Sequence, residues 1–306
     1  MHDESRKAIF AAFAANVGIA VMKFVGFVVT GSASLLAEAT HSVADTGNQG
    51  LLMLGGKRAS RGPDAQHQFG YGRERYFWSF LVSLGLFSMG GLSAIFEGVN
   101  KLRHPHRPGD LWVALLVLAG SMGFELYSLV TAVHQSERDR NSRSWWTYIR
   151  DSRTPELPVV LLEDTGALCG LLIAMSGIVL AHFTGNARWD AAGSLAIGTL
   201  LIVIAGILAV ELKSLLIGES AGSEKRQAIL DAMTGSPSVV RLIHLRTEHI
   251  GPEELLVGAK LQFDVSLSID QLAGVIDEVE RRVRAAVPEA RLIYIEPDIA
   301  REAPTP

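Results

Sequence analysis

Ionisable side chains lie inside an apolar segment that is long enough to cross a lipid bilayer. Residues 34–55 form this segment, and Glu38, His41 and Asp45 lie within it. A charged group inside hydrocarbon is costly, so such residues are rare there and usually functional. Spacings of three and four residues place all three on one face of a helix. Because imidazole nitrogen and carboxylate oxygen suit a borderline cation such as zinc, the segment predicts a divalent metal site within a membrane.

Six apolar segments have the length of a membrane crossing, which takes about 20 residues. The chain is 48% hydrophobic and 20% charged, and its apolar excess is concentrated before residue 218. We therefore predict an all-α bundle of six transmembrane helices over residues 1–217, in contact with the lipid bilayer. The helices are expected near residues 8–29, 34–55, 76–99, 111–134, 157–182 and 191–215.

The positive charges between these segments predict the orientation of the bundle. Lysine and arginine are frequent at the start and in the second and fourth connections, and less frequent on the opposite side, where the third connection still carries three. Cytoplasmic loops carry the excess of positive charge, so both termini are expected in the cytoplasm. The short polar start lacks a convincing cleavage site, so we expect the first helix to be retained. Because the start is short and polar and no obvious transit peptide is seen, we expect a bacterial inner membrane, with an organellar membrane as the alternative.

A small domain of different character is predicted after Gly218. Helical periodicity and strand-like alternation follow one another in the order αββαβ. The elements are expected at residues 223–233, 239–249, 255–267, 269–287 and 291–295. We interpret residues 218–300 as a cytoplasmic α+β domain with a ferredoxin-like arrangement, followed by a tail at 301–306. A domain of this size is marginal alone, so we expect it to pair with a second copy in a homodimer.

Two adjacent carboxylates interrupt the fifth apolar segment. Glu163 and Asp164 cannot both face lipid cheaply, and with His41 and Asp45 they could form a tetrahedral site between the second and fifth helices. Asp164 is the preferred ligand, because Glu163 points about 100° away around the helix. Glu163 is either a fourth ligand after local distortion or a proton carrier. The alternative interpretation is a set of interhelical hydrogen bonds that only hold the bundle together.

Other polar residues in the apolar segments carry weaker signals. Asn48 follows Asp45 by three residues, and an interhelical hydrogen bond is the favoured interpretation. Glu125 lies deep in the fourth segment and is a candidate partner for Lys23. A role for Glu125 in transport is the less favoured alternative.

Composition excludes several classes of function. The one cysteine, Cys169, allows neither a disulfide within the chain nor a thiolate zinc cluster. The net charge of -4, without a broad basic domain, argues against binding to nucleic acid. No nucleophile elbow or phosphate loop indicates an enzyme, and no bound cofactor is predicted beyond a transported metal. A membrane metal sensor or scaffold that does not move the ion stays open as an alternative.

Three motifs together resemble the cation diffusion facilitators. They are His41-xxx-Asp45, the acid that precedes residues 167–170, and the loop Gln-Phe-Gly-Tyr-Gly-Arg-Glu at 68–74. This family consists of metal–proton antiporters with a cytoplasmic αββαβ domain, usually as homodimers. The residues at 41–46 and 163–165 look most like the branch that includes a mitochondrial zinc exporter of animal cells.

The resemblance implies a ligand set with one member missing. His41 and Asp45 match the two ligands of the second helix, and Asp164 matches the second ligand of the fifth. The first ligand of that helix would fall at Val160, which cannot bind metal, so Glu163 or water would complete the shell. Because selectivity depends on ligand type and geometry, manganese, cobalt, iron(II) and nickel are alternatives to zinc.

The resemblance also concerns sites outside the bundle. Asp64 and His67 match a further family site in the loop after the second helix, but Tyr71 stands where some members have histidine. A solvated loop is favoured over this weak second site.

In the predicted cytoplasmic domain, one residue matches a metal ligand of the family and the other ligand positions hold different residues. His244 matches a family ligand, while Lys260, Gly274 and Tyr294 occupy histidine positions, and Glu296 replaces an aspartate. We therefore predict that this domain lacks the two-metal cluster of the family and serves for dimerisation.

These residues predict exchange of metal for protons. Metal binding requires neutral imidazole and ionised carboxylates, so metal and protons compete for the same groups. His41, Asp45 and Glu163 are the predicted proton-coupling residues. Efflux of the cation would then be driven by proton entry as helices rock around a site near the middle of the membrane.

Overall fold

The computed structural model describes residues 3–30, 33–104, 111–140 and 142–300, without the side chains of 3–9, 11–12, 26–27, 29–30, 33–41 and 44. The predicted tail at 301–306 therefore lies outside the described residues. The chain divides into two compact units. One contains residues 1–61 and 74–213, and the other contains residues 62–73 and 214–306.

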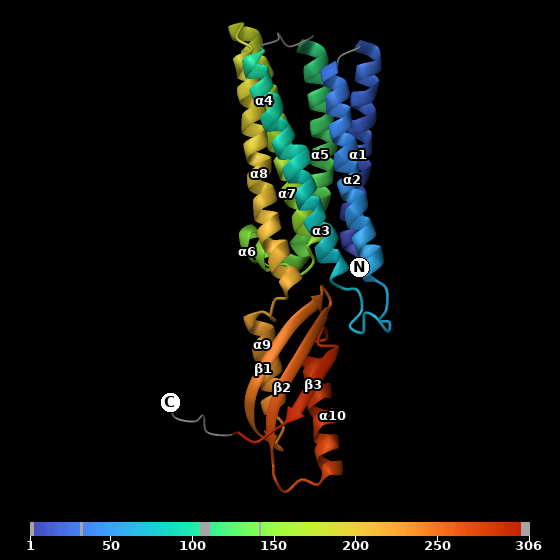
Figure 1. Cartoon of the computed structure of the whole chain (residues 1–306), viewed down its shortest axis with the longest axis vertical. Helices are drawn as coiled ribbons and strands as arrows, with labels where there is room; N and C mark the ends of the chain where they lie inside the picture. Colours follow the sequence, from blue (N-terminus) through green and yellow to red (C-terminus); the bar gives the residue numbers. More distant parts are fainter. Residues whose placement is uncertain (1–2, 31–32, 105–110, 141, 301–306) are drawn as a thin grey trace. The chain divides into compact units, whose positions relative to one another are not determined.

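The first unit is a bundle of long helices that run alongside one another (Figure 1). Its elements are α1 (Asp3–Thr30), α2 (Ala33–Ala59), α3 (Glu74–Gly85), the π-helical η1 (Leu86–Leu92), α4 (Ser93–Arg103), α5 (Leu111–Arg140), α6 (Trp145–Asp151), α7 (Glu156–Thr184) and α8 (Arg188–Ile217). Each of the six predicted segments is helical, and most helices extend a few residues beyond the predicted ends. α3, η1 and α4 together form one helical stretch.

Four helical stretches are long and apolar enough to cross a membrane, over the residues that the structure describes. They are Glu74–Arg103, Leu111–Arg140, Glu156–Thr184 and Arg188–Ile217. α1 and α2 have similar lengths, 28 and 27 residues. A shorter apolar helix, Phe13–Val25, lies within α1. α2 is less apolar because its sequence carries the polar residues that made it the candidate metal-binding helix.

Glycines let α8 approach the η1–α4 stretch closely. A Cβ atom on Gly198 of α8 would lie 2.8 Å from the carbonyl oxygen of Gly91. Further along the same crossing, a Cβ atom on Gly98 would lie 2.8 Å from Leu195. Small residues at helix crossings allow backbones to pack without lipid between them, and Gly91 plays this part here.

The fourth connection is more helical than predicted. The sequence suggested a polar stretch from Ser136 to Thr154, whereas α5 continues to Arg140 and α6 covers Trp145–Asp151. Ser144 caps α6 by accepting a hydrogen bond from the Thr147 amide at 3.1 Å. Tyr148 is buried, so the short helix is stabilised by one cap and one anchored aromatic side chain.

The second unit has the predicted αββαβ order. Its elements are α9 (Ser223–Thr234), β1 (Val239–Gly251), β2 (Glu254–Phe263), α10 (Ile269–Ala286) and β3 (Leu292–Pro297). The sheet order is β1-β2-β3, with β1 antiparallel and β3 parallel to β2. β2 ends earlier than predicted because the Asp264 carboxylate accepts bonds from the amide and hydroxyl of Ser266, which starts a turn. Gly218, where the change of character was predicted, has φ 114°, which favours glycine.

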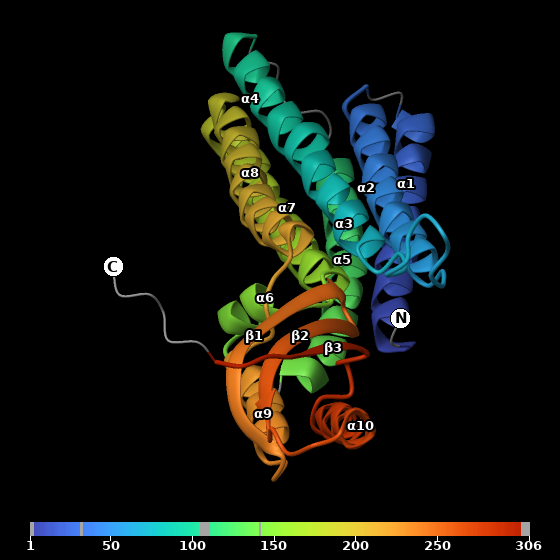
Figure 2. The ribbon, with the colours of Figure 1, turned by 60° about the horizontal axis from the view of Figure 1, so that its bottom comes forward.

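One face of the sheet is covered by both helices (Figure 2). Alternate residues of β2 are buried, as expected for a strand with one face on a core. They pack against Ile229 and Met233 of α9 and Val279 and Val283 of α10. The other face of the sheet therefore carries the polar residues of β2, including Lys260.

The loop between α2 and α3 packs on the β1–β2 hairpin. Residues 62–73 belong to the second unit, and Arg73 forms an ion pair with Glu248 of β1. A Cβ atom on Gly72 would lie 2.7 Å from the carbonyl oxygen of Ile250, so only glycine allows this approach. This association over a long sequence separation was not predicted from the sequence.

Replacing Ser268 by alanine is expected to lower the stability of the first turn of α10 by about 1 kcal/mol. Ser268 and Gln271 form a capping box, in which each side chain accepts from the other residue's amide, at 3.3 and 2.9 Å. Amide hydrogen exchange in the first turns of α10 should become about fivefold faster in the full chain. Ser223→Ala is the control, because α9 has no side-chain cap bond. Equal exchange rates in the two variants would contradict the capping role.

Candidate metal transport site

Buried polar side chains face one another within the helical bundle. α1 packs against α2, α5 and α7, and α5 packs against α7. The buried polar residues of these four helices include Lys23, Ser42, Asn48, Gln49, Glu125, Ser128, Glu163 and Asp164. Buried polar groups are costly without partners, so their contacts indicate how the site is built.

Glu163 is held by two amide side chains of α2. Gln49 Nε2 donates to Glu163 Oε2 at 2.7 Å, and Asn48 Nδ2 donates to Glu163 Oε1 at 3.4 Å. The interhelical hydrogen bond predicted for Asn48 is thereby confirmed. Gln49 Oε1 is buried and has no hydrogen-bond partner among the side chains and backbone that the structure describes. The two bonds join α2 to α7, the helices between which the sequence placed the cation.

Asp164 faces a different helix. Its Oδ2 accepts a hydrogen bond from Ser128 Oγ of α5 at 2.6 Å. The adjacent carboxylates of α7 thus point to α2 and α5 respectively, as the 100° step of a helix requires. Ser128 was missed by the sequence analysis. Its position three residues after Glu125, on the same face of an apolar helix, was the available signal.

Four carboxylates lie within electrostatic reach of one another. The charge of Asp45 acts on Glu163 and on Glu125, and the charge of Asp164 acts on both of them as well. Lys23 of α1 acts on Glu125. Asp45 is half-buried, whereas the other three acids are buried. We call Asp45, Glu125, Glu163 and Asp164 the acid cluster. Glu125 is its unexpected member, because a role in transport was the less favoured interpretation of this residue from the sequence.

The complete predicted ligand set is not described by the structure. The side chains of Glu38 and His41 lie outside the described residues, although the backbone places His41 one helical turn before Asp45 on α2. Val160 is fully buried on α7, one turn before Asp164, and offers no ligand atom. Among the described histidine, cysteine, aspartate and glutamate side chains, no group of three is arranged to hold a metal. The ligand set therefore stays a prediction.

Asp64 organises the loop after α2. Its Oδ1 accepts from the amides of Gln66 and His67, at 2.9 and 2.7 Å, and its Oδ2 accepts from the Tyr71 hydroxyl at 2.6 Å. Asp64 Oδ1 also lies 3.7 Å from His67 Nδ1, and the ring of His67 contacts Tyr71. The bond from Tyr71, followed by those from the loop amides, lowers the pKa of Asp64 below its ordinary value of 3.8. The carboxylate therefore stabilises the loop at neutral pH, and this contribution is lost as pH falls through the lowered pKa.

Asp64→Ala is expected to speed trypsin cleavage after Arg61 several-fold at neutral pH. The change removes the acceptor for two amides and a hydroxyl, so the loop opens more often. The control is His67→Ala, which keeps the backbone amide bond. A chelator added to the unsubstituted protein should leave cleavage unchanged if these bonds alone order the loop, and should speed it if Asp64 and His67 hold a metal. An Asp64→Ala rate equal to that of the unsubstituted protein would contradict the role of Asp64.

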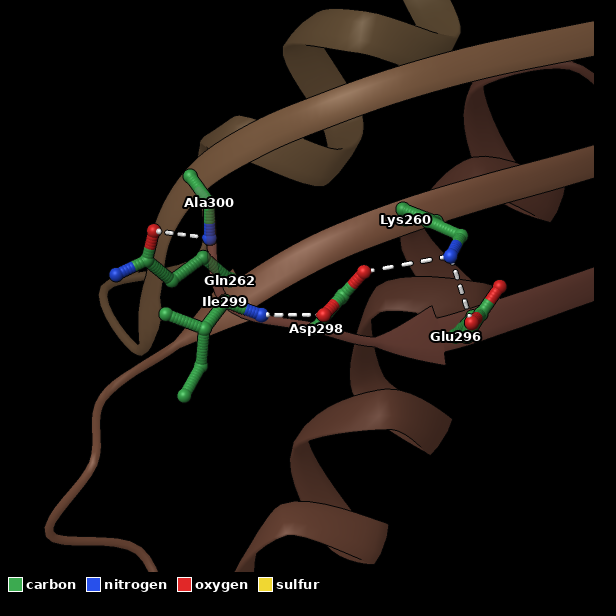
Figure 3. Close-up of polar contacts among 6 residues, drawn as sticks. All are labelled: Lys260, Gln262, Glu296, Asp298, Ile299 and Ala300. Carbon is green, nitrogen blue, oxygen red and sulfur yellow. Dashed lines mark hydrogen bonds and ion pairs between the residues drawn. The ribbon is translucent and has the colours of Figure 1, made fainter. Parts of the chain in front are cut away.

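A lysine forms ion pairs with two carboxylates on the face of the sheet opposite α9 and α10 (Figure 3). Lys260 Nζ lies 2.8 Å from Glu296 Oε1 and 3.3 Å from Asp298 Oδ2. The hydrogen bonds that Lys260 donates to Glu296 and Asp298, in that order of effect, raise the pKa of Lys260. His244 is the partner of Lys260 in the neighbouring strand. The ammonium thus neutralises carboxylates that could otherwise serve a metal beside His244.

Comparison with known proteins identifies the helical bundle. The family model described as the cation efflux transmembrane domain matches residues 9–217. The human protein named "Proton-coupled zinc antiporter SLC30A9, mitochondrial" is 35% identical over 260 residues, 84% of this chain and 46% of its own. Metal tolerance protein C4 of Arabidopsis thaliana is 32% identical over 263 residues, 85% of this chain and 57% of its own. The chain thus spans about half the length of these two relatives.

A bacterial relative is more distant. The magnetosome protein MamM of Paramagnetospirillum magneticum is 23% identical over 309 residues, 98% of this chain and 89% of its own. The prediction of a bacterial inner membrane is therefore wrong, because the much stronger matches are to a mitochondrial animal protein and a plant protein. That prediction depended on the short polar start of the sequence, which does not distinguish one membrane from another.

The match over residues 9–217 agrees with the resemblance noted from His41, Asp45 and Asp164. It covers all the helices that carry the acid cluster, and the relative at 35% identity extends the likeness over most of the chain. The family model and the four long apolar helices together indicate a multi-pass membrane protein. The chain therefore belongs to the cation efflux family of transmembrane proteins.

Proposed function

We propose that this chain exchanges a divalent metal cation, zinc in the first instance, for protons across a membrane. The observation that carries the proposal is the acid cluster, four carboxylates gathered from α2, α5 and α7 inside an apolar bundle. Such a concentration of acids in hydrocarbon is costly unless a cation or protons neutralise it. The human relative named as a proton-coupled zinc antiporter supports the same cargo and coupling. Membership of a cation efflux family favours transport over catalysis.

The proposed ligands are His41, Asp45, Asp164 and Glu163. To reach the metal, Glu163 would exchange its bonds from Asn48 and Gln49 for a bond to the cation, or it would keep them and carry a proton. Metal and protons compete for these groups, so His41, Asp45 and Glu163 couple the two movements. Protonation from the far side then releases the cation and lets the empty site return.

The membrane topology and the role of the second unit are inferred from the sequence. All six helices α1, α2, α3–α4, α5, α7 and α8 cross the membrane, with both termini in the cytoplasm. The second unit acts as a ferredoxin-like dimerisation module without the two-metal cluster, and the ion pairs of Lys260 support this role. The weak second site at Asp64 and His67 stays a prediction.

Flux measurements on purified protein in liposomes test the proposal. A zinc-sensitive dye and a pH-sensitive dye inside the liposomes report both movements after zinc is added under an imposed pH gradient. We expect zinc entry, coupled to proton exit, that is absent from protein-free liposomes. Zinc binding without flux would favour a sensor or scaffold. Flux of manganese, cobalt, iron(II) or nickel in place of zinc would support exchange of metal for protons but identify a different transported cation.

A further inference from the structure

We propose that Ser128 of α5 is a specificity-determining residue, which makes the transport site prefer zinc to cations of higher coordination number such as manganese. The proposal rests on the transport function proposed above and deepens it. Ser128 acts through Asp164, the proposed ligand of α7, so it is a positioning residue. The packing of α5 against α7 brings the hydroxyl to the carboxylate.

Ser128 holds Asp164 in a direct and buried contact. The two side chains are 1% and 2% exposed, and Ser128 Oγ donates to Asp164 Oδ2 at 2.6 Å. A distance at the short end of the range is typical of a hydroxyl that donates to a carboxylate. Because both groups are buried, bulk water does not compete for this bond. One oxygen of the proposed ligand is therefore engaged by α5.

Several other hydroxyls in the bundle form their bonds within their own helix. Examples are Ser88, Thr131, Ser176 and Thr199, each of which donates to the carbonyl oxygen four residues earlier. This local bond is the one that a serine or threonine in a helix readily forms. A hydroxyl has only one proton to donate, so Ser128 gives up the local bond when it donates to Asp164. The direction of its hydroxyl is thus a specific feature of the site.

The bond restricts how Asp164 can bind a cation. A carboxylate with Oδ2 engaged by a donor binds a metal preferably through Oδ1 alone. Binding through one oxygen suits zinc, which takes four ligands in a tetrahedron. Manganese favours an octahedral shell of oxygen atoms, and a carboxylate that binds through both oxygens helps to fill a larger shell. The hydroxyl of Ser128 therefore favours zinc through the geometry of its ligand.

Matched variants isolate the hydroxyl. Ser128→Ala removes it, and Ser121→Ala makes the same change two helical turns earlier on the same face of α5. Ser121 is also 1% exposed, and its hydroxyl has no hydrogen-bond partner within the part of the chain that the structure describes. Ser128→Thr and Ser128→Val form a second pair, because threonine and valine have nearly the same shape and only threonine keeps the donor.

The experiment measures zinc transport and manganese transport separately in liposomes under the same pH gradient. The quantity compared is the ratio of kcat/KM for zinc to kcat/KM for manganese. We expect this ratio to fall about tenfold in Ser128→Ala, the lower end of the effect of removing a partner behind a metal ligand. Ser121→Ala should keep the ratio of the unsubstituted protein, and Ser128→Thr should keep a higher ratio than Ser128→Val. A purely structural role of Ser128 would slow both cations equally and leave the ratio unchanged.

Two results would overturn the proposal: equal ratios in Ser128→Ala and Ser121→Ala, or equal ratios in the threonine and valine variants. Should Ser128→Ala not be recovered as folded protein, the second pair still tests the hydroxyl. If the unsubstituted protein moves neither cation, the transport function itself fails, which is a distinct result. Calorimetric titration of the full chain in detergent with zinc and with manganese then tests Ser128, and the same change is expected in the ratio of the two dissociation constants.

Discussion

Replacing Asp45 by alanine is expected to abolish zinc transport in liposomes. Asp45 is the half-buried member of the acid cluster and a proposed metal ligand. Loss of a partner outside the first coordination sphere typically lowers metal affinity 10- to 100-fold, so removal of a ligand should cost at least about 100-fold. The measurement is the initial rate of zinc entry under a pH gradient, with protein recovery checked by size-exclusion chromatography.

The matched control makes the same chemical change elsewhere in the bundle. Asp190 of α8 pairs with Lys101 at 3.0 Å and lies outside the acid cluster. Asp190→Ala should therefore transport at nearly the normal rate. If Asp45→Ala transports as well as this control, Asp45 is not a ligand. Asp45→Glu keeps the carboxylate and should retain part of the activity if only ligand position is disturbed.

Replacing Glu156 by alanine is expected to destabilise the helical unit by about 3–5 kcal/mol. Glu156 of α7 and Arg75 of α3 form an ion pair at 3.3 Å, with side chains 1% and 6% exposed. Removal of the acid leaves a buried guanidinium without its counter-charge, and this desolvated charge is the main cost. The measurement is thermal unfolding in detergent, where a clear fall of the melting temperature should appear.

A double replacement distinguishes the free-energy cost of a buried charge without its partner from the net contribution of the ion pair to stability. Arg75→Met combined with Glu156→Leu removes both charges and keeps apolar volume, so stability should return close to normal. Glu97→Gln, at an exposed pair with Lys101 at 3.9 Å, should change stability by less than about 1 kcal/mol. A Glu156→Ala variant as stable as Glu97→Gln would show that the buried pair contributes little.

Much of the fold could be predicted because its signals are local. The six apolar segments and the αββαβ order depend on hydrophobic periodicity and length, which neighbouring residues establish. The connection at α6 and the early end of β2 were missed, because a serine cap and an Asx turn decide them over only a few residues. The bacterial location was wrong for another reason, since it was inferred from the short polar start of the sequence, which does not identify the membrane.

That carboxylates and a histidine occur in apolar helical segments could be predicted from the sequence, because segment length and hydrophobicity depend on neighbouring residues alone. Which of these groups meet depends on the packing of the helices. Packing of α1, α2, α5 and α7 brings Glu125 and Lys23 to the acids, and it holds Glu163 between Asn48 and Gln49. Helix periodicity fixes the direction of a side chain on its own helix, whereas its partner depends on how helices far apart in sequence pack together.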